Sequence, residues 1–336
     1  MENIKFGIIG LGNIGKRHLA VLDANKNVEV VQICDIDVEK CKAQAALYNY
    51  INYTVDYNEI LSNSEIDMVC ICTPHATHKP IAIDSSNAGK NVLVEKPMAL
   101  SSVDCDLMIK AAKENGKRLF VVKQNRYNMP VMLVKEALES GKLGEIHMVN
   151  CSVLWNRNIE YYSESDWRGS KLKEGGALYT QASHFIDLLV WCFGEIVEAK
   201  TTLQNKIHDI DFEDCGSTVV SFANGAIGNI IWTNVVYSKN YEGSITLIGE
   251  NGTIKIGGKY LNTIEYWDVK GYELRTDIVF EDKPNLYGKY QGTSSNHDKV
   301  MEKIVEEFSS GKNLVVDGEE GKKTVRAIEK IYQGQR

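Results

Sequence analysis

The stretch Ile4-Lys5-Phe6-Gly7-Ile8-Ile9-Gly10-Leu11-Gly12-Asn13-Ile14-Gly15 decides the fold of this chain. Its opening half is a short apolar run without regular polar alternation, which is typical of a strand buried on both faces. The glycines that follow have the spacing G-x-G-x-x-G and lead into residues 14–24, where apolar side chains recur with helical spacing. In this pattern Gly10 permits a tight turn, Gly12 lets the backbone approach a pyrophosphate, and Gly15 lets the helix pack on the strand. The stretch therefore predicts a strand–loop–helix unit that binds a dinucleotide.

The residues around this loop predict which dinucleotide binds. The free amides of Asn13 and Ile14 at the start of the helix would face the negative charge of the pyrophosphate. Asp35 follows the second expected strand, where a carboxylate accepts hydrogen bonds from the adenosine ribose, and Ile36 comes next. Because this carboxylate would repel a 2′-phosphate, the sequence favours NAD over NADP. The alternative, that Asp35 is a simple turn residue, is weaker because Asp37 is the better cap for the next helix.

Strands and helices alternate through the first third of the chain. The expected strands are 4–9, 28–34, 68–73, 91–94 and 119–122, and the expected helices are 14–24, 38–48, 76–88 and 101–115. Short apolar strands that alternate with helices of this length indicate a parallel, doubly wound sheet. We therefore expect residues 1–122 to form an α/β domain with a doubly wound parallel sheet that binds NAD.

From about residue 123 the pattern changes, and strands dominate. The expected strands are 147–155, 197–203, 216–222, 226–236, 243–248 and 253–256, and the expected helices are 129–140, 177–193, 296–309 and 318–333. Asn224-Gly225 and Glu250-Asn251-Gly252 lie between neighbouring strands and are strong hairpin signals. We expect residues 123–336 to form an α+β domain with an antiparallel sheet and helices on one face.

The composition of the chain limits its partners. Its 336 residues carry a formal net charge of −7, so we expect no general attraction to nucleic acid or to an anionic membrane. The longest apolar runs are too short to span a bilayer, and the N-terminus leads directly into a strand without room for a signal peptide. None of the eight cysteines forms a C-x-x-C pair, so we expect free thiols in a reducing cytoplasm.

A lysine at the end of an expected strand is the first candidate for chemistry. Glu95-Lys96-Pro97 directly follows residues 91–94, at the carboxyl edge of the sheet, where the ligands of doubly wound folds gather. A partly desolvated lysine there has a lowered pKa and can polarise or deprotonate a hydroxyl. The alternative is an ordinary surface lysine at a strand end, which would be the better interpretation without the dinucleotide loop.

A histidine in the second half of the chain is the other candidate for chemistry. His184 lies on the helix expected over residues 177–193, and Thr180 precedes it by one turn on the same face. A histidine in this place can exchange a hydrogen bond with a substrate oxygen. On periodicity alone, a hydrogen-bonded core histidine is the simpler interpretation.

Two further groups of residues bear on possible ligands. A stretch of aromatic and basic side chains suits an anionic, ring-bearing ligand; its members are Arg126, Tyr161, Tyr162, Trp167 and Arg168. The alternative is an ordinary strand edge and loop, and for Tyr161 and Tyr162 the sequence does not favour either interpretation. His75 and His78 lie close enough in sequence to share a metal ion, but no third ligand lies near them, so we expect no metal site.

The chain resembles the glucose–fructose oxidoreductase / inositol dehydrogenase (Gfo/Idh/MocA) family over nearly its whole length. The motifs that carry the resemblance, in the family's order, are Gly10–Gly15, Asp35, Cys72-Thr73-Pro74 with His78, Glu95-Lys96-Pro97, Trp167-Arg168, Gly175-Gly176 and His184. The resemblance implies a Rossmann domain followed by an α+β domain, whose large, mostly antiparallel open sheet often mediates dimers or tetramers. It also implies that Lys96 is the active-site lysine and that the Lys96–Pro97 bond is cis.

The resemblance also assigns residues to the two ligands. Besides the glycine loop, Asp35 and Ile36, the residues expected to bind the cofactor are Thr73, Pro74, His75, His78, Glu95, Lys96, Gln124, Trp167 and Arg168. Those expected to bind the substrate are Lys96, Asn125, Arg126, Tyr161, Thr180, His184 and His297. Many family members carry an aspartate where this chain has Thr180, and threonine orients a histidine without making it a stronger base. We therefore expect Lys96 to accept the proton, with His184 assisting.

Several segments are similar to a bacterial subgroup of dehydrogenases that oxidise the 3-hydroxyl of UDP-N-acetylglucosaminuronic acid in surface-polysaccharide biosynthesis. They are Tyr161-Tyr162, Trp167-Arg168-Gly169, 175–178, 184–189 and 316–321. This similarity implies a nucleotide-sugar substrate and, for some members, 2-oxoglutarate as the means of regenerating NAD. The alternatives are a dehydrogenase of a free cyclitol or aldose, and an NAD-sensing protein without turnover. Intact Lys96 and His184 argue against the sensor, which has no need of them.

Overall fold

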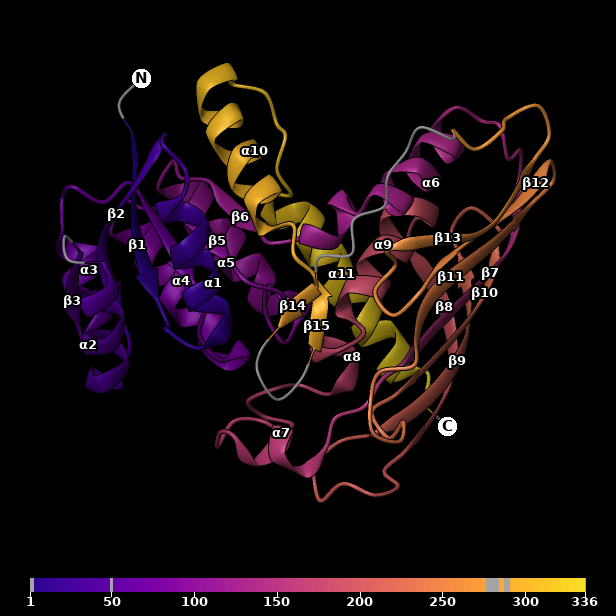
Figure 1. The fold of residues 1–336 in the computed structure, drawn as a ribbon, viewed down its shortest axis with the longest axis horizontal. Helices are drawn as coiled ribbons and strands as arrows, with labels where there is room; N and C mark the ends of the chain where they lie inside the picture. Colours follow the sequence, from indigo (N-terminus) through magenta and orange to yellow (C-terminus); the bar gives the residue numbers. More distant parts are fainter. Residues whose placement is uncertain (1–2, 49–50, 276–283, 287–290, 336) are drawn as a thin grey trace. The chain divides into compact units, whose positions relative to one another are not determined.

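The computed structural model describes residues 3–48, 51–275, 284–286 and 291–335 and divides into two compact units (Figure 1). The first unit consists of Met1–Lys123 and His297–Val325, and the second of Gln124–Asn296 and Arg326–Arg336. This division differs from a single cut after residue 122, because a C-terminal segment groups with the first unit. Across the described residues we find no helix with the length and hydropathy that a bilayer crossing requires.

The first unit is built on a six-stranded parallel sheet with the strand order β3-β2-β1-β4-β5-β6. The strands are β1 Ile4–Ile9, β2 Val28–Cys34, β3 Asn52–Thr54, β4 Met68–Ile71, β5 Asn91–Val94 and β6 Leu119–Val121. All of β4 and most of β1 and β5 are buried, as in a parallel sheet covered on both faces. The expected doubly wound sheet is confirmed.

Most helices of the first unit begin where the sequence predicts them. They are α1 Asn13–Asp23, α2 Val38–Leu47, α3 Tyr57–Ser62, α4 His78–Asn87, α5 Ser102–Glu114 and α10 His297–Ser310. Asp37 caps α2, because its carboxylate accepts hydrogen bonds from the amides of Glu39 and Lys40. The sequence did not predict β3 and α3, which are short, and two of the three β3 residues are exposed at the edge of the sheet.

The C-terminal segment belongs to the first unit through contacts with β6 and its flanks. The Val121 amide donates to the Val316 carbonyl at 2.9 Å, and Arg118 forms an ion pair with the buried carboxylate of Glu307 at 3.1 Å. Helix α11, Gly318–Gln333, begins in the first unit and ends in the second. No local pattern predicted that the C-terminal segment groups with the first unit, because the strand–helix alternation ends near residue 122.

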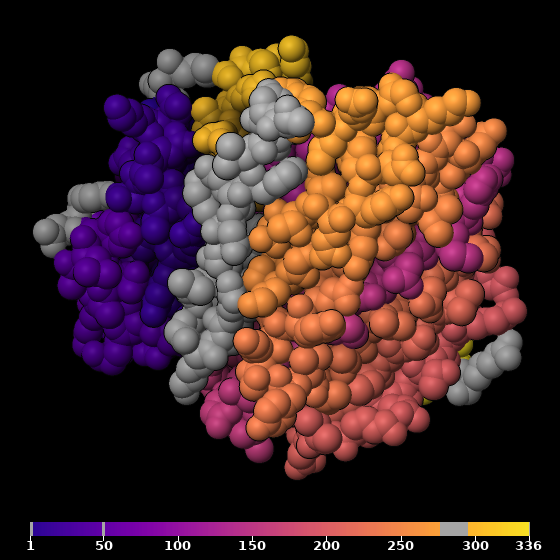
Figure 2. Space-filling model, turned by 45° about the vertical axis from the view of Figure 1, so that its right-hand side comes forward, coloured from indigo at the N-terminus to yellow at the C-terminus, as the bar shows by residue number. Residues whose placement is uncertain are grey.

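The second unit is built on a seven-stranded sheet with the order β13-β12-β11-β7-β10-β9-β8. The strands are β7 Ile146–Leu154, β8 Ile196–Gln204, β9 Cys215–Phe222, β10 Ile227–Thr233, β11 Glu242–Gly249, β12 Gly252–Gly257 and β13 Thr263–Val269. Every neighbouring pair is antiparallel except β7 and β10, which run parallel. In Figure 2 the magenta band of β7 lies between salmon and orange strands, as this order requires. The mostly antiparallel sheet and both hairpins are confirmed.

The helices of the second unit depart from the expectation at one functional position. They are α6 Met129–Glu139, α7 Ile159–Ser163, α8 Ala177–Thr180 and α9 Ser183–Phe193, and a short strand pair, β14 Pro284–Leu286 and β15 Gln291–Ser294, follows. The prediction of a single helix over 177–193 is wrong, because the helical conformation is interrupted between α8 and α9. The Ala182 amide reaches back to the Ala177 carbonyl, five residues earlier, which interrupts the regular helical hydrogen bonds.

Candidate active site

The glycine loop joins β1 to α1 with the geometry that a dinucleotide site needs. Gly10 has a φ of +95°, and a Cβ there would lie 2.6 Å from the Cys72 carbonyl oxygen. A Cβ on Gly15 would overlap the Gly10 carbonyl oxygen. By contrast, a Cβ on Gly12 would meet no protein atom within 4 Å, so the backbone at this position is open to a ligand. Each glycine is therefore placed as the spacing predicts for a pyrophosphate loop.

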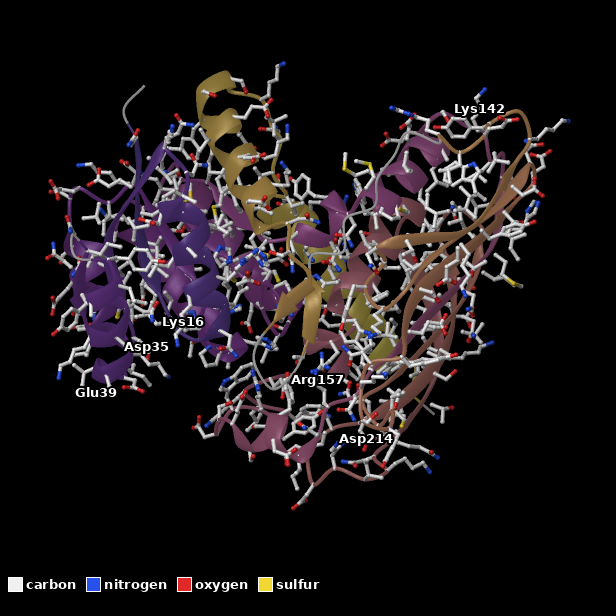
Figure 3. All side chains as sticks on the ribbon, in the orientation of Figure 1. Lys16, Asp35, Glu39, Lys142, Arg157 and Asp214 are labelled. Atoms are coloured by element: carbon white, nitrogen blue, oxygen red, sulfur yellow. The ribbon has the colours of Figure 1, made fainter. Side chains whose placement is uncertain are left out.

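Asp35 holds the glycine loop from the end of β2. Its carboxylate accepts hydrogen bonds from the Leu11 amide at 2.7 Å and from the Asp37 amide at 2.9 Å (Figure 3). Gly12 is the N-cap of α1 and has no side chain to satisfy the first-turn amides, so these amides are available to an anion. Ile36 is almost fully exposed beside this carboxylate. The loop, the carboxylate and the start of α1 together fit NAD.

A turn after β4 is held by a buried histidine. His78 is fully buried, with Nδ1 2.8 Å from the Pro97 carbonyl oxygen and Nε2 2.9 Å from the Thr73 carbonyl oxygen. Burial lowers the pKa of His78, although hydrogen bonds to the two carbonyls act in the opposite direction. The Lys96–Pro97 bond is cis, as the resemblance implied. The structure thus brings Thr73 and Pro74, with the buried His75 beside them, to the segment that carries Lys96.

Glu95 links the lysine segment to α1. Its Oε1 lies 2.7 Å from His18 Nε2, and its Oε2 accepts a hydrogen bond from the Lys96 amide at 3.1 Å. Burial would raise the pKa of Glu95, but the hydrogen bond and the charge of His18 lower it to about 2. Lys96 itself is partly exposed just beyond β5. A buried carboxylate therefore fixes the backbone of the candidate catalytic lysine.

His297, the first residue of α10, joins the same buried cluster. Its Nε2 lies 3.7 Å from Glu95 Oε1, and its ring meets the His18 ring edge-on, with 5.1 Å between the centroids. Burial lowers the pKa of His297 to about 3, so its imidazole is neutral at physiological pH. The side chain has no exposed surface in this structure. Contact between His297 and a substrate stays a prediction.

In the second unit, a buried ion pair fixes the segment Gln124–Tyr127. Arg126 donates from Nε and from a terminal nitrogen to the two carboxylate oxygens of Asp187, each at 2.8 Å. The guanidinium also lies over the Trp191 ring, 4.8 Å from its centroid. Arg126 is therefore tied to α9, the helix that carries His184. Asp187 was not predicted from the sequence as a partner in this region, although its place one turn after His184 was a usable signal.

His184 is buried near the start of α9 and faces an amide side chain. The Gln124 Nε2 atom lies 3.4 Å from His184 Nε2, while Asn125 is buried beside it in the same short helical turn. Thr180 lies on α8, and its hydroxyl donates to the Gly176 carbonyl at 3.3 Å. Because α8 and α9 are separate helices, the argument that Thr180 and His184 share one helical face is wrong.

The aromatic and basic residues of the second unit do gather. Arg168 lies over the Tyr161 ring at 4.0 Å and the Trp167 ring at 5.6 Å, and it forms an ion pair with Glu164 at 2.6 Å. Tyr161 is buried, and its hydroxyl accepts a hydrogen bond from the Gln181 side chain at 3.1 Å. These contacts form one aromatic cluster with the Arg168 cation on its face.

Two buried charged residues near this cluster, Arg157 and Asp214, were not predicted from the sequence as functional (Figure 3). Arg157 is buried and lies 5.2 Å from the centroids of both the Trp155 and Tyr161 rings. Asp214 is fully buried and accepts hydrogen bonds from the amides of residues 206–208 and lies 3.1 Å from His208 Nδ1. No local motif marks either residue, because their partners lie far away or in an irregular loop.

Two family models match the chain. The first, described as an oxidoreductase family with an NAD-binding Rossmann fold (Gfo/Idh/MocA), matches residues 4–123. The second, the Gfo/Idh/MocA C-terminal domain, matches residues 131–255. Together they account for most of the chain.

Solved structures are similar over almost the whole chain. The WlbA dehydrogenase from Bordetella pertussis, in complex with NADH and UDP-GlcNAcA, is 33% identical with a TM-score of 0.90, covering 99% of this chain and 96% of that one. The WlbA dehydrogenase from Chromobacterium violaceum, also with NADH and UDP-GlcNAcA, is 32% identical with a TM-score of 0.91, covering 99% and 94%.

A curated relative has another named substrate. Inositol 2-dehydrogenase from Salmonella typhimurium is 32% identical over 197 residues, but the match covers only 57% of this chain and 55% of that protein. The levoglucosan dehydrogenase of Pseudarthrobacter phenanthrenivorans is 27% identical over 287 residues, covering 76% of this chain and 73% of that protein. These relatives share a kind of chemistry and differ in the sugar or cyclitol that they are named for.

Proposed function

The chain belongs to the Gfo/Idh/MocA oxidoreductase family, and we propose that it oxidises the C3 hydroxyl of UDP-N-acetylglucosaminuronic acid. Its coarser activity is that of an NAD-dependent sugar oxidoreductase. One observation carries the substrate proposal: across 99% of its length the chain is similar to two dehydrogenases that were each solved with NADH and UDP-GlcNAcA. An anionic nucleotide sugar also suits the cluster formed by Tyr161, Trp167 and Arg168.

Lys96 is the proposed base. NAD, when bound, supplies the acceptor for the hydride, so the protein must hold the sugar and remove the hydroxyl proton. A lysine does this when its ammonium is partly desolvated and its pKa falls toward the working pH. Lys96 lies just beyond the carboxyl end of β5, and its backbone amide donates a hydrogen bond to the Glu95 carboxylate.

His184 is proposed to orient the reacting hydroxyl. Thr180 stands where many family members carry an aspartate, and a threonine hydroxyl orients a histidine without making it a stronger base. The Asp187 carboxylate, on the same helix, forms two hydrogen bonds with Arg126. The Nε2 atom of His184 lies 3.4 Å from the neutral Gln124 side chain, which helps to orient the ring. His184 therefore exchanges a hydrogen bond with the substrate while Lys96 takes the proton.

The setting of the reaction forms a further part of this proposal. We infer a cytoplasmic homo-oligomer that acts in surface-polysaccharide biosynthesis and regenerates NAD by reducing 2-oxoglutarate. Exposed apolar side chains on the strands of the large sheet support the oligomer, since such patches commonly mark protein contacts. They include Met148, Val197, Val219, Ile227 and Ile248.

The test is to follow the absorbance of reduced nicotinamide after adding UDP-N-acetylglucosaminuronic acid to the purified protein with NAD. We expect a rise with UDP-N-acetylglucosaminuronic acid and no rise with UDP-N-acetylglucosamine, which lacks the sugar carboxylate. When 2-oxoglutarate is then added, the absorbance should fall while 2-hydroxyglutarate accumulates, because NADH passes its hydride to the 2-oxo acid. The Lys96→Arg variant is the matched control, because it keeps the charge but does not deprotonate. Turnover of UDP-N-acetylglucosamine at the same rate would contradict the substrate proposal.

A second candidate is a dehydrogenase of a free cyclitol or aldose. The 32% identity to inositol 2-dehydrogenase favours it, although the match covers little more than half of that protein. A free cyclitol needs no uridine pocket, so UDP should not compete with it. Reduction of NAD by myo-inositol, unaffected by UDP, would replace the nucleotide-sugar proposal, and no reduction with any sugar would favour an NAD sensor.

A further inference from the structure

Two thiols and an imidazole form a buried group beside the glycine loop. Cys70 lies on β4, Cys72 follows that strand, and His18 projects from α1. The two Sγ atoms are 3.7 Å apart, and one potential ligand atom from each of the three side chains lies within 4.8 Å of the others. None of the three residues is more than 6% exposed. Such a group of soft ligands needs an explanation that the dehydrogenase reaction does not provide.

The imidazole of His18 has one nitrogen occupied and one without a partner. Its Nε2 lies 2.7 Å from Glu95 Oε1, while its Nδ1 has no hydrogen-bond partner among the described residues, although His18 is fully buried. A buried polar atom without a partner is unfavourable. Histidines that bind a metal commonly donate their other ring N–H to a carboxylate, and the pair of His18 and Glu95 has this arrangement.

We propose that Cys70, Cys72 and His18 bind a zinc ion, with Glu95 as the carboxylate behind the histidine. Two thiolates at about 2.3 Å from a tetrahedral zinc ion lie about 3.8 Å apart, close to the 3.7 Å between the two Sγ atoms. Thiolate and imidazole are also the ligands that zinc prefers. The remaining tetrahedral position is open to a water molecule.

A second possible ligand group shares His18. It consists of His18, Glu95 and His297, which also offer atoms within 4.8 Å of one another. Because the 2.7 Å contact between His18 Nε2 and Glu95 Oε1 is already a hydrogen bond, Nδ1 is the His18 nitrogen that is left for a metal ion, and Glu95 serves as its partner on the other nitrogen. The structure therefore assigns the ion to the two cysteines, and removing a cysteine distinguishes the two groups.

The position of this site gives the ion a structural role. It would join α1 to the end of β4, and Cys72 is the residue whose carbonyl oxygen restricts Gly10 to glycine. A Cβ on Gly15 would also lie 3.4 Å from the Cys72 Cβ. The ion would thus hold the glycine loop, with no part in hydride transfer. This site was not predicted, because His18 lies far from Cys70 and Cys72 in the chain and the histidine pair considered for a metal ion, His75 with His78, lies elsewhere.

The first experiment measures metal in the full-length protein, produced without a histidine tag in zinc-supplemented medium and purified without chelator. Elemental analysis is expected to find about one zinc ion per chain. The Cys70→Ala and Cys72→Ala variants should lose it. Cys34→Ala is the matched control, because Cys34 is a buried thiol on neighbouring β2 outside the group and should leave the zinc content unchanged. Wild-type protein with less than about a tenth of an ion per chain, or cysteine variants that keep their zinc, would overturn the proposal.

A second measurement needs no variant and so does not depend on the folding of one. Cobalt added to the metal-free wild-type protein should give the intense near-ultraviolet absorption of thiolate-bound cobalt. Adding a chelator to the zinc-loaded protein should lower its Tm and weaken NAD binding, measured by fluorescence without substrate. If cobalt gives no thiolate band and the chelator changes neither quantity, the cysteines and His18 are ordinary core residues.

Discussion

The glycine-loop region of the first unit and the His184 region of the second contain candidate residues of one reaction, but they are built in different ways. In the first, a single stretch from β1 to α1 contains the glycines, and Asp35 follows at the end of the next strand. In the second, Gln124 comes from one segment and His184 from another, 60 residues apart. A local motif therefore suffices for the first region, whereas tertiary packing assembles the second.

Both regions depend on a buried ion pair. Glu95 and His18 are joined by one contact of 2.7 Å, and Asp187 and Arg126 by two parallel hydrogen bonds of 2.8 Å. The two-pronged geometry of arginine fixes orientation as well as distance. The arrangement of residues in the His184 region therefore depends more on its ion pair than the glycine-loop region does, because no backbone motif holds the residues of the His184 region in place.

The largest expected effect separates the two candidate catalytic residues. Lys96→Ala should lower turnover by roughly two to four orders of magnitude, since it removes the proposed proton acceptor. His184→Ala should lower turnover less, because the role proposed for His184 is to orient the hydroxyl. Steady-state kinetics with the preferred sugar, together with NAD affinity, measures both variants. Exposed Lys110→Ala on α5 is the control, and a larger loss in His184→Ala would reverse the two roles.

The next effect tests the ion pair of the second region. Asp187→Ala leaves the Arg126 guanidinium buried without its counter-charge, so the free energy of unfolding should fall by about 3–5 kcal/mol. Urea unfolding measures this loss. Glu139→Gln breaks the ion pair between the exposed Glu139 carboxylate and the partly buried Lys135 in the same unit, and it should cost less than about 1 kcal/mol. Equal losses in the two variants would show that the buried pair has no special role.

A pair of glycine substitutions sharpens the contrast between the two regions. Gly12→Ala should weaken NAD binding with little change in Tm, because its Cβ meets no protein atom but would face the pyrophosphate. Gly225→Ala, in the β9–β10 hairpin at φ +92°, should lower stability by about 1–2 kcal/mol and leave NAD affinity unchanged. Calorimetric titration with NAD and thermal unfolding separate the two outcomes. Unchanged NAD affinity in Gly12→Ala would exclude Gly12 from the cofactor site.

The smallest effect concerns pH and the second unit. Burial would raise the pKa of Asp214, but hydrogen bonds from the amides of residues 206–208 lower it below the ordinary value of 3.8. The ionised carboxylate therefore stabilises the fold above that value, and this contribution is lost as the pH falls through the lower, folded-state pKa. Asp214→Asn should lower Tm near pH 7, and its difference from the wild type should narrow below about pH 4. The exposed Asp209→Asn should show no such trend, and a constant difference at all pH values would contradict the assignment.

The sequence predicted the elements whose pattern is local and strong. Strands β2 and β5 have the bounds expected from their apolar runs, because a strand buried on both faces needs a continuous apolar segment. The edge strand β3 was missed because it is short and mostly exposed. The interruption between α8 and α9 was also not predicted, because the apolar spacing on either side of residues 181 and 182 fits one helix, whereas the regular helical hydrogen bonds stop there.

The sequence alone determined the parallel sheet, the glycine loop with Asp35, and the family, because each depends on residues close together or in a fixed order. Only the tertiary structure decided that His297–Val325 joins the first unit, that Arg126 is bound by Asp187, and that His18 meets both Glu95 and a pair of thiols. The physical reason is that helical and strand periodicity record which face of an element is buried. Periodicity does not record which distant side chain packs against that face, and these long-range contacts set the charge and the ligands of a site.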